Sequence, residues 1–222
     1  MKLVHPEING VFDFDSGVLN TLIIENQGFL YRFLSDIVMQ INGENGKSIL
    51  SENDAPVNVS GNVEVIDSFA DFSLNRKNVL SKLASSIENS ASDAKNYETT
   101  MSVLGEVERY LNQISRDLPF DVAFPKLSVA SIIKAASPEI CDDAETLSEK
   151  ILNYIEIVYE LDKPKLIVIV NMRSFACDEE AELFARTVIP HGYRILMVES
   201  AERKKLPFEK RIIIDGDLCE IS

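Results

Sequence analysis

The residues from Gly43 to Ser48 read Gly-Glu-Asn-Gly-Lys-Ser and end like a phosphate-binding P-loop. In a P-loop, the backbone amides and the lysine surround the phosphates of a nucleotide. That loop also needs an earlier glycine, for which this chain has Ile41, and it must join a strand to the helix that follows it. Here the segment comes after an expected helix, so the pattern predicts a Gly/Asn hairpin turn and no phosphate site.

Residues for nucleotide hydrolysis are also missing where the fold would place them. The apolar segment 19–25 is an expected strand, but the residues from Glu25 to Gly28 contain no lysine and no glycine cradle. A second apolar segment, 165–170, ends at Asn171, where a nucleotide hydrolase has an aspartate that holds magnesium. We therefore expect a degenerate, P-loop-like α/β head that keeps the topology of a nucleotide fold without its chemistry, because a fold does not carry a function.

Other catalytic groups are equally scarce. His5 and His191 have no nucleophile at a recognisable spacing, and the chain contains neither GxSxG nor HExxH. The acidic run 178–180 suits the start of a helix, where negative charge is favoured. The cysteines are widely spaced and are expected to be reduced thiols: Cys141, Cys177 and Cys219. The sequence therefore predicts no catalytic residue and no enzyme.

Two carboxylates lie close to an expected helix break. Asp117 and Asp121 are four residues apart, and carboxylate oxygens are the ligands that hard cations such as calcium prefer. Two carboxylates are too few for a complete calcium site. The residues alone therefore favour a capped helix end.

The charge of the chain is strongly acidic but unevenly spread. It has 22 Lys/Arg and 36 Asp/Glu, for a net charge of −14, so it lacks the overall basic footprint of a nucleic-acid protein. Residues 1–60 hold three basic and eight acidic side chains, whereas residues 71–135 hold eight of each. Phosphate binding requires only local clustering of basic residues. Composition alone favours a mixed, solvated helix surface for the basic residues of this region: Arg76, Lys77, Lys82, Lys126 and Lys134.

The pattern of apolar residues predicts an α/β head domain (1–70 and 140–222) with an inserted α-helical leg domain (71–139). In the first part of the head we expect strands at KLV, VFDFD and LNTLIIE, a helix at 27–40, and hairpin strands at SIL and VEVI. In the leg, apolar residues recur at steps of three and four with no proline from Asn75 to Leu118, which predicts an antiparallel helical hairpin.

The remaining elements return the chain to the head. A short helix is expected at 128–136 and a longer one capped by Asp142 or Asp143. KLIVIV and YRILMVES predict buried parallel strands, with a helix beginning at Asp178 between them and final strands at KRIIID and LCEIS. No apolar run is long enough to span a membrane, and the N-terminus does not read as a signal peptide, so a cytoplasmic protein is expected.

The order of these elements, together with the segment from Glu145 to Ser200, resembles a known family. That segment reads ETLSEKILNYIEIVYELDKPKLIVIVNMRSFACDEEAELFARTVIPHGYRILMVES. It is similar to the small, non-catalytic adaptation protein of type II-A CRISPR systems. The likeness is strongest from about Leu111 to Ser200 and weaker in the N-terminal strands.

This resemblance implies a homotetrameric ring that binds the ends of linear double-stranded DNA in a central hole lined by lysines and arginines. It also implies partnership with the CRISPR adaptation integrase and effector nuclease. Lys134 and Lys150 fall where the family has lysine, so they are the first candidates for DNA binding. Further candidates are Lys126, Arg76 and Lys77.

The family also binds structural calcium through alternating acidic residues. Asp117 and Asp121 match that segment, but the acidic position between them is Pro119 here. The acidic residues that follow are replaced by Ala123, Phe124 and Pro125. The interruption argues against a calcium requirement in this chain.

The leading hypothesis is non-enzymatic, sequence-independent binding of double-stranded DNA ends during spacer acquisition. The alternative is an α/β adaptor whose helical arm binds protein and not DNA. A third reading, a nucleotide-dependent enzyme, requires that ATP bind without the missing phosphate cradle.

Overall fold

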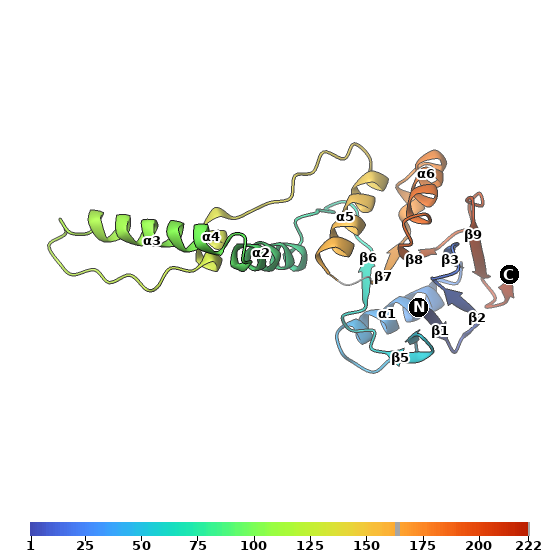
Figure 1. The fold of residues 1–222 in the computed structure, drawn as a ribbon. Coiled ribbons are helices and arrows are strands. Elements are labelled where there is room, and N and C mark those ends of the chain that lie inside the picture. The colour runs from blue at the N-terminus through green and yellow to red at the C-terminus, as the bar shows by residue number, and fades with distance from the viewer. Residues whose placement is uncertain (163–164, 222) are drawn as a thin grey trace. The chain divides into compact units, whose positions relative to one another are not determined.

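A computed structural model describes residues 1–162 and 165–221. The chain forms two compact units, which we call the head unit (Met1–Ser73 and Asp143–Ser222) and the leg unit (Leu74–Asp142). The leg unit is inserted into the head unit, so the chain leaves the head once and returns once (Figure 1). Each unit has its own helices, and the strands all belong to the head unit in the part of the chain that the structure describes.

The head unit is built around a six-stranded sheet with the order β10-β9-β3-β8-β7-β6. Neighbouring strands are parallel except β10, which is antiparallel to β9. The strands are β3 (Leu19–Ile24), β6 (Val63–Ile66), β7 (Leu166–Val170), β8 (Arg194–Glu199), β9 (Glu209–Ile214) and β10 (Glu220–Ile221). All residues of β3 and β7 are buried, as expected for continuous apolar strands of a parallel sheet covered on both faces.

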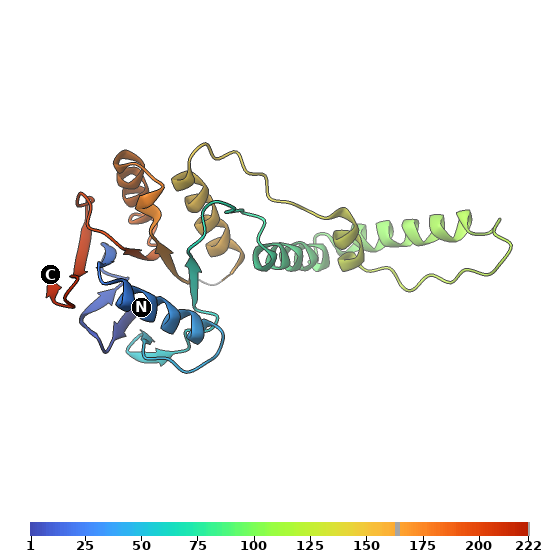
Figure 2. The ribbon, with the colours of Figure 1, turned by 180° about the vertical axis from the view of Figure 1, so that it is seen from behind.

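Three helices cover this sheet. Helix α1 (Gln27–Ile41) lies on one face, and α5 (Leu147–Leu161) and α6 (Asp178–Val188) lie on the other (Figures 1 and 2). Asn26 caps α1 by accepting the Phe29 N–H at 2.9 Å, and Phe29, Phe33 and Ile37 then bury one side of the helix at steps of four. The expected cap of α5 at Asp142 or Asp143 is wrong, because Thr146 forms a capping box with Glu149.

A smaller antiparallel sheet completes the head unit, with the order β2-β1-β4-β5. Its strands are β1 (Lys2–His5), β2 (Ile8–Asp13), β4 (Ile49–Glu52) and β5 (Ala55–Val57). The expected hairpin between SIL and VEVI is wrong: SIL in β4 pairs with β5, and VEVI forms β6 beside β7. The reason lies at Asn53 and Asp54, whose φ angles of 51° and 60° make the two-residue turn that returns β4 directly into β5.

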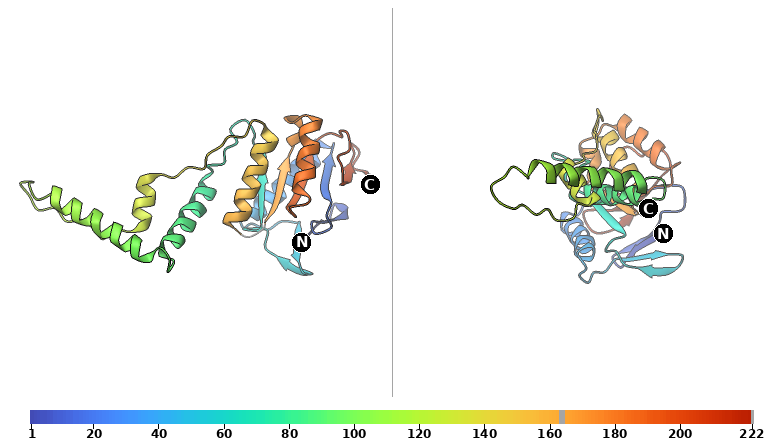
Figure 3. Two further views of the ribbon diagram at one scale, coloured as in Figure 1. Left: turned by 45° about the horizontal axis from the view of Figure 1, so that its top comes forward. Right: turned by 60° about the vertical axis from the view of Figure 1, so that its left-hand side comes forward.

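The leg unit contains α2 (Lys77–Ser92), α3 (Tyr97–Ile114) and α4 (Val129–Ala136). The expected antiparallel hairpin of its two long helices is wrong, because α3 points away from α2 and it is α4 that lies beside α2 (Figure 3). Leu104 is the one residue of α3 that is buried. Val107 and Leu111 are half-buried, and five further large apolar side chains of the helix are exposed: Tyr97, Met101, Val103, Tyr110 and Ile114. The apolar stripe of α3 thus has little cover within the described leg unit.

The core of the head unit gives a first prediction. Phe33 is fully buried between α1 and the two sheets, so Phe33→Ala should lower the free energy of unfolding by about 3–5 kcal/mol through lost transfer energy and a cavity. The matched control is Tyr31→Ala on the opposite side of the same helix, where the side chain is 74% exposed and the expected change is below about 0.5 kcal/mol. Urea unfolding measures both, and equal losses would contradict this packing.

Candidate nucleic-acid interface

The two units carry very different charge. The leg unit holds eight Lys/Arg and nine Asp/Glu, a net charge of −1 out of the −14 of the whole chain. The head unit carries the remaining −13. An anionic polymer is therefore repelled far less by the leg unit than by the head unit as a whole.

A groove runs between α2 and α4 of the leg unit. Its volume is about 790 Å³, and Leu80 and Ile133 contribute to an apolar floor. Two of the predicted DNA-binding residues, Lys77 and Lys134, line it together with the carboxylates of Glu88 and Glu139. The fold brings these two lysines to one place although 57 positions separate them in the sequence (134 − 77).

The other predicted DNA-binding residues lie outside this groove. Lys126 is exposed in the irregular segment before α4, and Arg76 is the half-exposed residue that precedes α2. Lys150 belongs to α5 of the head unit. Arg76 and Lys150 already interact with other side chains or backbone groups, whereas Lys77, Lys126 and Lys134 form no ion pair within the described residues. These three lysines are thus the ones whose charge is available to a ligand.

The two predicted metal ligands have no third His, Cys, Asp or Glu side chain close by among the described residues. Asp117 and Asp121 are both exposed and follow the end of α3, where the Ser115 N–H donates to the Leu111 carbonyl. Throughout residues 1–162 and 165–221, no group of three His, Cys, Asp or Glu side chains lies close enough to hold a cation. Calcium takes six to eight oxygen ligands, so the residues present do not fit it.

The Gly43–Ser48 loop is already filled by a carboxylate of the chain itself. The backbone N–H groups of Lys47 and Ser48 donate to Asp36 at 2.6 and 3.0 Å, and the Ser48 hydroxyl donates at 2.8 Å. Burial acts to raise the pKa of Asp36, but these hydrogen bonds outweigh it and the pKa is lowered. The loop joins α1 to β4, so the hairpin turn expected here is wrong, although the expected absence of a strand-to-helix P-loop context is correct.

The carboxyl ends of the parallel strands are closed by hydrogen bonds within the chain. At the start of α1 the Asn26 amide donates to the Gly216 carbonyl at 2.9 Å, while its oxygen caps the helix. At the end of β7, Asn171 has a φ of 56° and its side-chain oxygen accepts the Ser200 N–H at 2.8 Å. Ligands of such sheets bind at these ends, and here the side chains of Asn26 and Asn171 are already used in hydrogen bonds within the chain.

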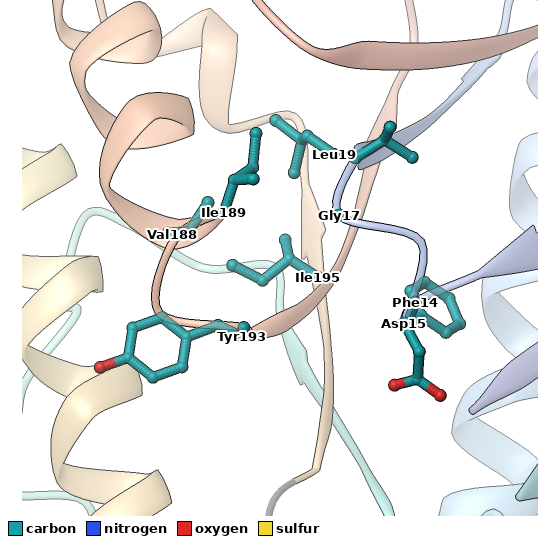
Figure 4. A pocket seen from close by; sticks show the side chains of 10 residues that line it. Phe14, Asp15, Gly17, Leu19, Val188, Ile189, Tyr193 and Ile195 are labelled. Carbon is teal, nitrogen blue, oxygen red and sulfur yellow. The ribbon is translucent and has the colours of Figure 1, made fainter.

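A small cavity of about 270 Å³ lies at the opposite end of β3 and β8 (Figure 4). Leu19, Ile189 and Ile195 point into it, whereas the Tyr193 hydroxyl points away. Asp15 at its edge is neutralised by the N-terminal amine and by Arg194, whose Nε lies 3.2 Å from the carboxylate. The cavity therefore offers an apolar surface and no acid–base pair.

The two histidines lie apart from one another. His5 is buried against the rings of Phe29 and Phe33, and its Nδ1 accepts the Glu7 N–H at 3.2 Å. His191 is exposed and stacks on Tyr193. Among the described residues, neither histidine forms a hydrogen bond with a serine, threonine or cysteine side chain.

Sequence reasoning missed two buried charged residues, Arg173 and Glu199, beside the carboxyl ends of β7 and β8. The backbone N–H of Arg173 donates to the Glu199 carboxylate at 3.2 Å, and the Arg173 guanidinium donates to Asp178 at 2.7 Å. Burial raises the pKa of Glu199 to about 7 against the opposing effect of Arg173. Each residue looks like an ordinary charged residue at a strand end, so no local signal in the sequence reveals that folding buries both.

A known protein family matches this chain. The family model "CRISPR-associated protein (Cas_Csn2)" matches residues 40–218, which is most of the chain. The chain belongs to the Cas_Csn2 family. The resemblance read from the sequence is thus confirmed, and Cas_Csn2 membership assigns the chain a CRISPR-associated role.

A solved structure agrees with the Cas_Csn2 fold. The crystal structure of Stu0660 of Streptococcus thermophilus is similar with a TM-score of 0.58 and 15% identity, over 89% of this chain and 68% of that one. At this identity the likeness speaks for the fold alone. A comparison with curated protein sequences gives no match. Within its described residues, this Cas_Csn2 chain has no helix with the length and apolar character needed to cross a membrane.

The buried Glu199 of this Cas_Csn2 protein gives a prediction for pH. Folding raises its pKa from 4.5 to about 7, so the folded state binds the proton more tightly and stability falls as the pH rises from about 4.5 to 7. From pH 5 to pH 8 the free energy of unfolding of wild type should therefore fall by on the order of 2–3 kcal/mol because of this group. Glu199→Gln cannot ionise, so its free energy of unfolding should not show that fall. Urea unfolding at both pH values measures it, with exposed Glu202→Gln as control. Parallel profiles for wild type and Glu199→Gln would contradict the burial.

Proposed function

We propose that this protein is a non-enzymatic, sequence-independent binder of double-stranded DNA ends that acts in spacer acquisition of a type II-A CRISPR system. The observation that carries the proposal is the near-neutral leg unit, in which three of the predicted DNA-binding lysines are exposed and form no ion pair within the described residues: Lys77, Lys126 and Lys134. Contacts to phosphates supply affinity without reading the base sequence. Cas_Csn2 membership supports the CRISPR role.

The topology of the head unit supports descent from a P-loop-like fold. Numbered in chain order, the five parallel strands β3, β6, β7, β8 and β9 stand in the order 5-1-4-3-2 across the sheet. Residues that could bind a nucleotide are replaced or used within the chain, as at Asn26, Asp36 and Asn171. We therefore propose that the head unit serves as a scaffold and not as a nucleotide hydrolase.

The exposed side of α3 supports assembly into a homotetrameric ring. Single apolar side chains on a surface are ordinary, but a run of them on one helix marks an interaction surface. Met101, Tyr110 and Ile114 are 43%, 61% and 53% exposed, and burying them against other copies would return apolar area from water. Through its family likeness the ring would work with the adaptation integrase and effector nuclease in the cytoplasm.

Calcium is not part of the proposal. Asp117 and Asp121 lack a third ligand among the described residues, and exposed Phe120 and Phe124 stand beside them. We therefore expect DNA binding to persist when calcium is removed.

The deciding experiment is fluorescence anisotropy with a labelled linear duplex, competed by linear and by covalently closed circular DNA of the same sequence. We expect linear DNA to compete and closed circular DNA to fail, with the same result in calcium and in chelator. Equal competition by both forms would refute end binding. If the protein is a monomer or dimer and binds neither form of DNA, with or without calcium, the protein–protein adaptor is favoured instead.

The lysines of the α2–α4 groove give a second test. Lys77→Glu combined with Lys134→Glu should weaken binding to all duplex sequences alike and reduce the slope of log affinity against log salt by about 2, since each phosphate contact contributes about 1. Lys95→Glu is the control, because Lys95 is an exposed lysine of the same unit that does not line the groove. An unchanged slope in the double variant would exclude these lysines from the DNA contact.

A further inference from the structure

Two phenylalanines form an exposed aromatic pair at the carboxyl edge of the head-unit sheet. Phe69 follows β6, and Phe175 follows the 3-10 turn Met172–Ser174 after β7. The ring centroids are 5.2 Å apart at an angle of 53°, so the half-buried Phe69 supports the ring of Phe175. Phe175 is nevertheless 63% exposed, which leaves much of its ring in contact with water. Two aromatic rings held together at the surface are a ready stacking platform.

A basic loop lies directly beside this pair. The sequence has one run of three consecutive basic residues, Arg203 to Lys205. The Arg203 guanidinium lies 3.4 Å from the hydroxyl of Ser174, the residue before Phe175. Lys204 pairs with Glu182 at 2.9 Å, whereas Arg203 and Lys205 form no ion pair within the described part of the chain. Arg203 therefore places a cation next to the residue that precedes Phe175, and the exposed Lys205 adds a second cation to the same loop, in a unit whose net charge is −13.

Buried charged residues fix the backbone of the loop that carries Arg203 to Lys205. Arg173, which is 3% exposed, donates to the Lys204 carbonyl at 2.7 Å. The Leu206 N–H donates to the buried Glu209 carboxylate at 2.7 Å, and Glu209 is held in turn by Arg211 at 2.8 Å. A loop fixed in this way loses little conformational entropy when it binds a ligand. The buried Arg173 and Glu209 thus position the backbone that carries the exposed Arg203 and Lys205.

We propose that Phe175 stacks on the terminal base pair of a DNA end while Arg203 and Lys205 contact the adjacent phosphates. Inside a duplex both faces of each base pair are covered by neighbours, so only an end exposes a face on which an aromatic ring can stack. Cations beside the ring match the phosphates that flank that face. This inference rests on the proposed function and adds a physical means by which the protein distinguishes an end from the interior of a duplex.

The same features make a protein partner the less suitable occupant. An apolar patch for a protein interface is typically depleted in lysine at its centre, whereas the loop that adjoins the aromatic pair carries two lysines, Lys204 and Lys205, beside Arg203. Stacking on an aromatic side chain tolerates any base, in keeping with binding that does not depend on sequence.

The test compares two duplexes of identical sequence, one with open ends and one closed at both ends by hairpin loops. Both are linear and can enter a ring, but only the open duplex exposes a terminal base pair. Full-length wild type should bind the open duplex more tightly. Phe175→Ser should lose about tenfold in affinity for the open duplex and leave the closed duplex unchanged.

Phe208→Ser is the matched control, because Phe208 is also a phenylalanine of the head unit and is 64% exposed. It should bind both duplexes as wild type does. Phe175→Leu keeps an apolar side chain without an aromatic ring, so it carries the test if the serine variant does not fold. Arg203→Ala and Lys205→Ala should each lower the salt slope for open duplex by about 1, with exposed Arg186→Ala as control.

The two levels of proposal fail in different ways. If wild type binds neither duplex, the proposed function itself is wrong. If wild type binds both duplexes but folded Phe175→Ser and Phe175→Leu bind the open one as tightly as wild type, DNA binding stands and the stacking proposal is overturned. Equal losses in Phe175→Ser and Phe208→Ser would likewise overturn it, because the effect would not be specific to the aromatic pair.

Discussion

The burial of a parallel sheet on both faces is the constraint on which the head unit depends. Strand β7 has no exposed residue, so it needs a layer of side chains above and below it. Helix α1 supplies one layer through Phe33 and its neighbours, and α5 and α6 supply the other. Because parallel strands need a long crossover, the connection from β6 to β7 has room for the entire leg unit before α5 returns to the sheet.

Charge follows the same division. The head unit can carry −13 because its charged groups are mostly solvated or paired, while the leg unit stays near neutrality and keeps Lys77 and Lys134 on one groove. Backbone amides near these loops donate to side chains of the chain itself: those of Lys47 and Ser48 donate to Asp36, and that of Ser200 donates to Asn171. The lysines that form no ion pair within the described residues, among them Lys77 and Lys134, lie at the surface where a polyanion can reach them.

The sequence was sufficient where a pattern is local. Continuous apolar runs marked β7 and β8, and four-residue spacing marked α1. It failed where the answer depends on a distant partner: VEVI is apolar enough to be a strand, but nothing in it specifies β7 as its neighbour. The same holds for α3, whose apolar stripe predicted a partner helix without saying which, and for Arg173 and Glu199, which meet only after folding. Of the candidate DNA-binding residues, spacing alone could not bring Lys77 to Lys134. The basic run that holds Arg203 and Lys205 is hidden in the composition by the strongly acidic total of the head unit.

The insertion of the leg unit between β6 and β7 also orders the events of synthesis. Val63 pairs with Leu166, so about a hundred residues separate the two sides of this strand pair. As the chain leaves the ribosome, β6 cannot find its neighbour until the whole leg unit and α5 have followed it. The apolar edge of the nascent head must wait for that length of chain, and long-range pairing of this kind slows folding and leaves strand edges exposed to other chains. The inserted leg unit therefore postpones the pairing of β6 with β7 until most of the chain has been synthesised.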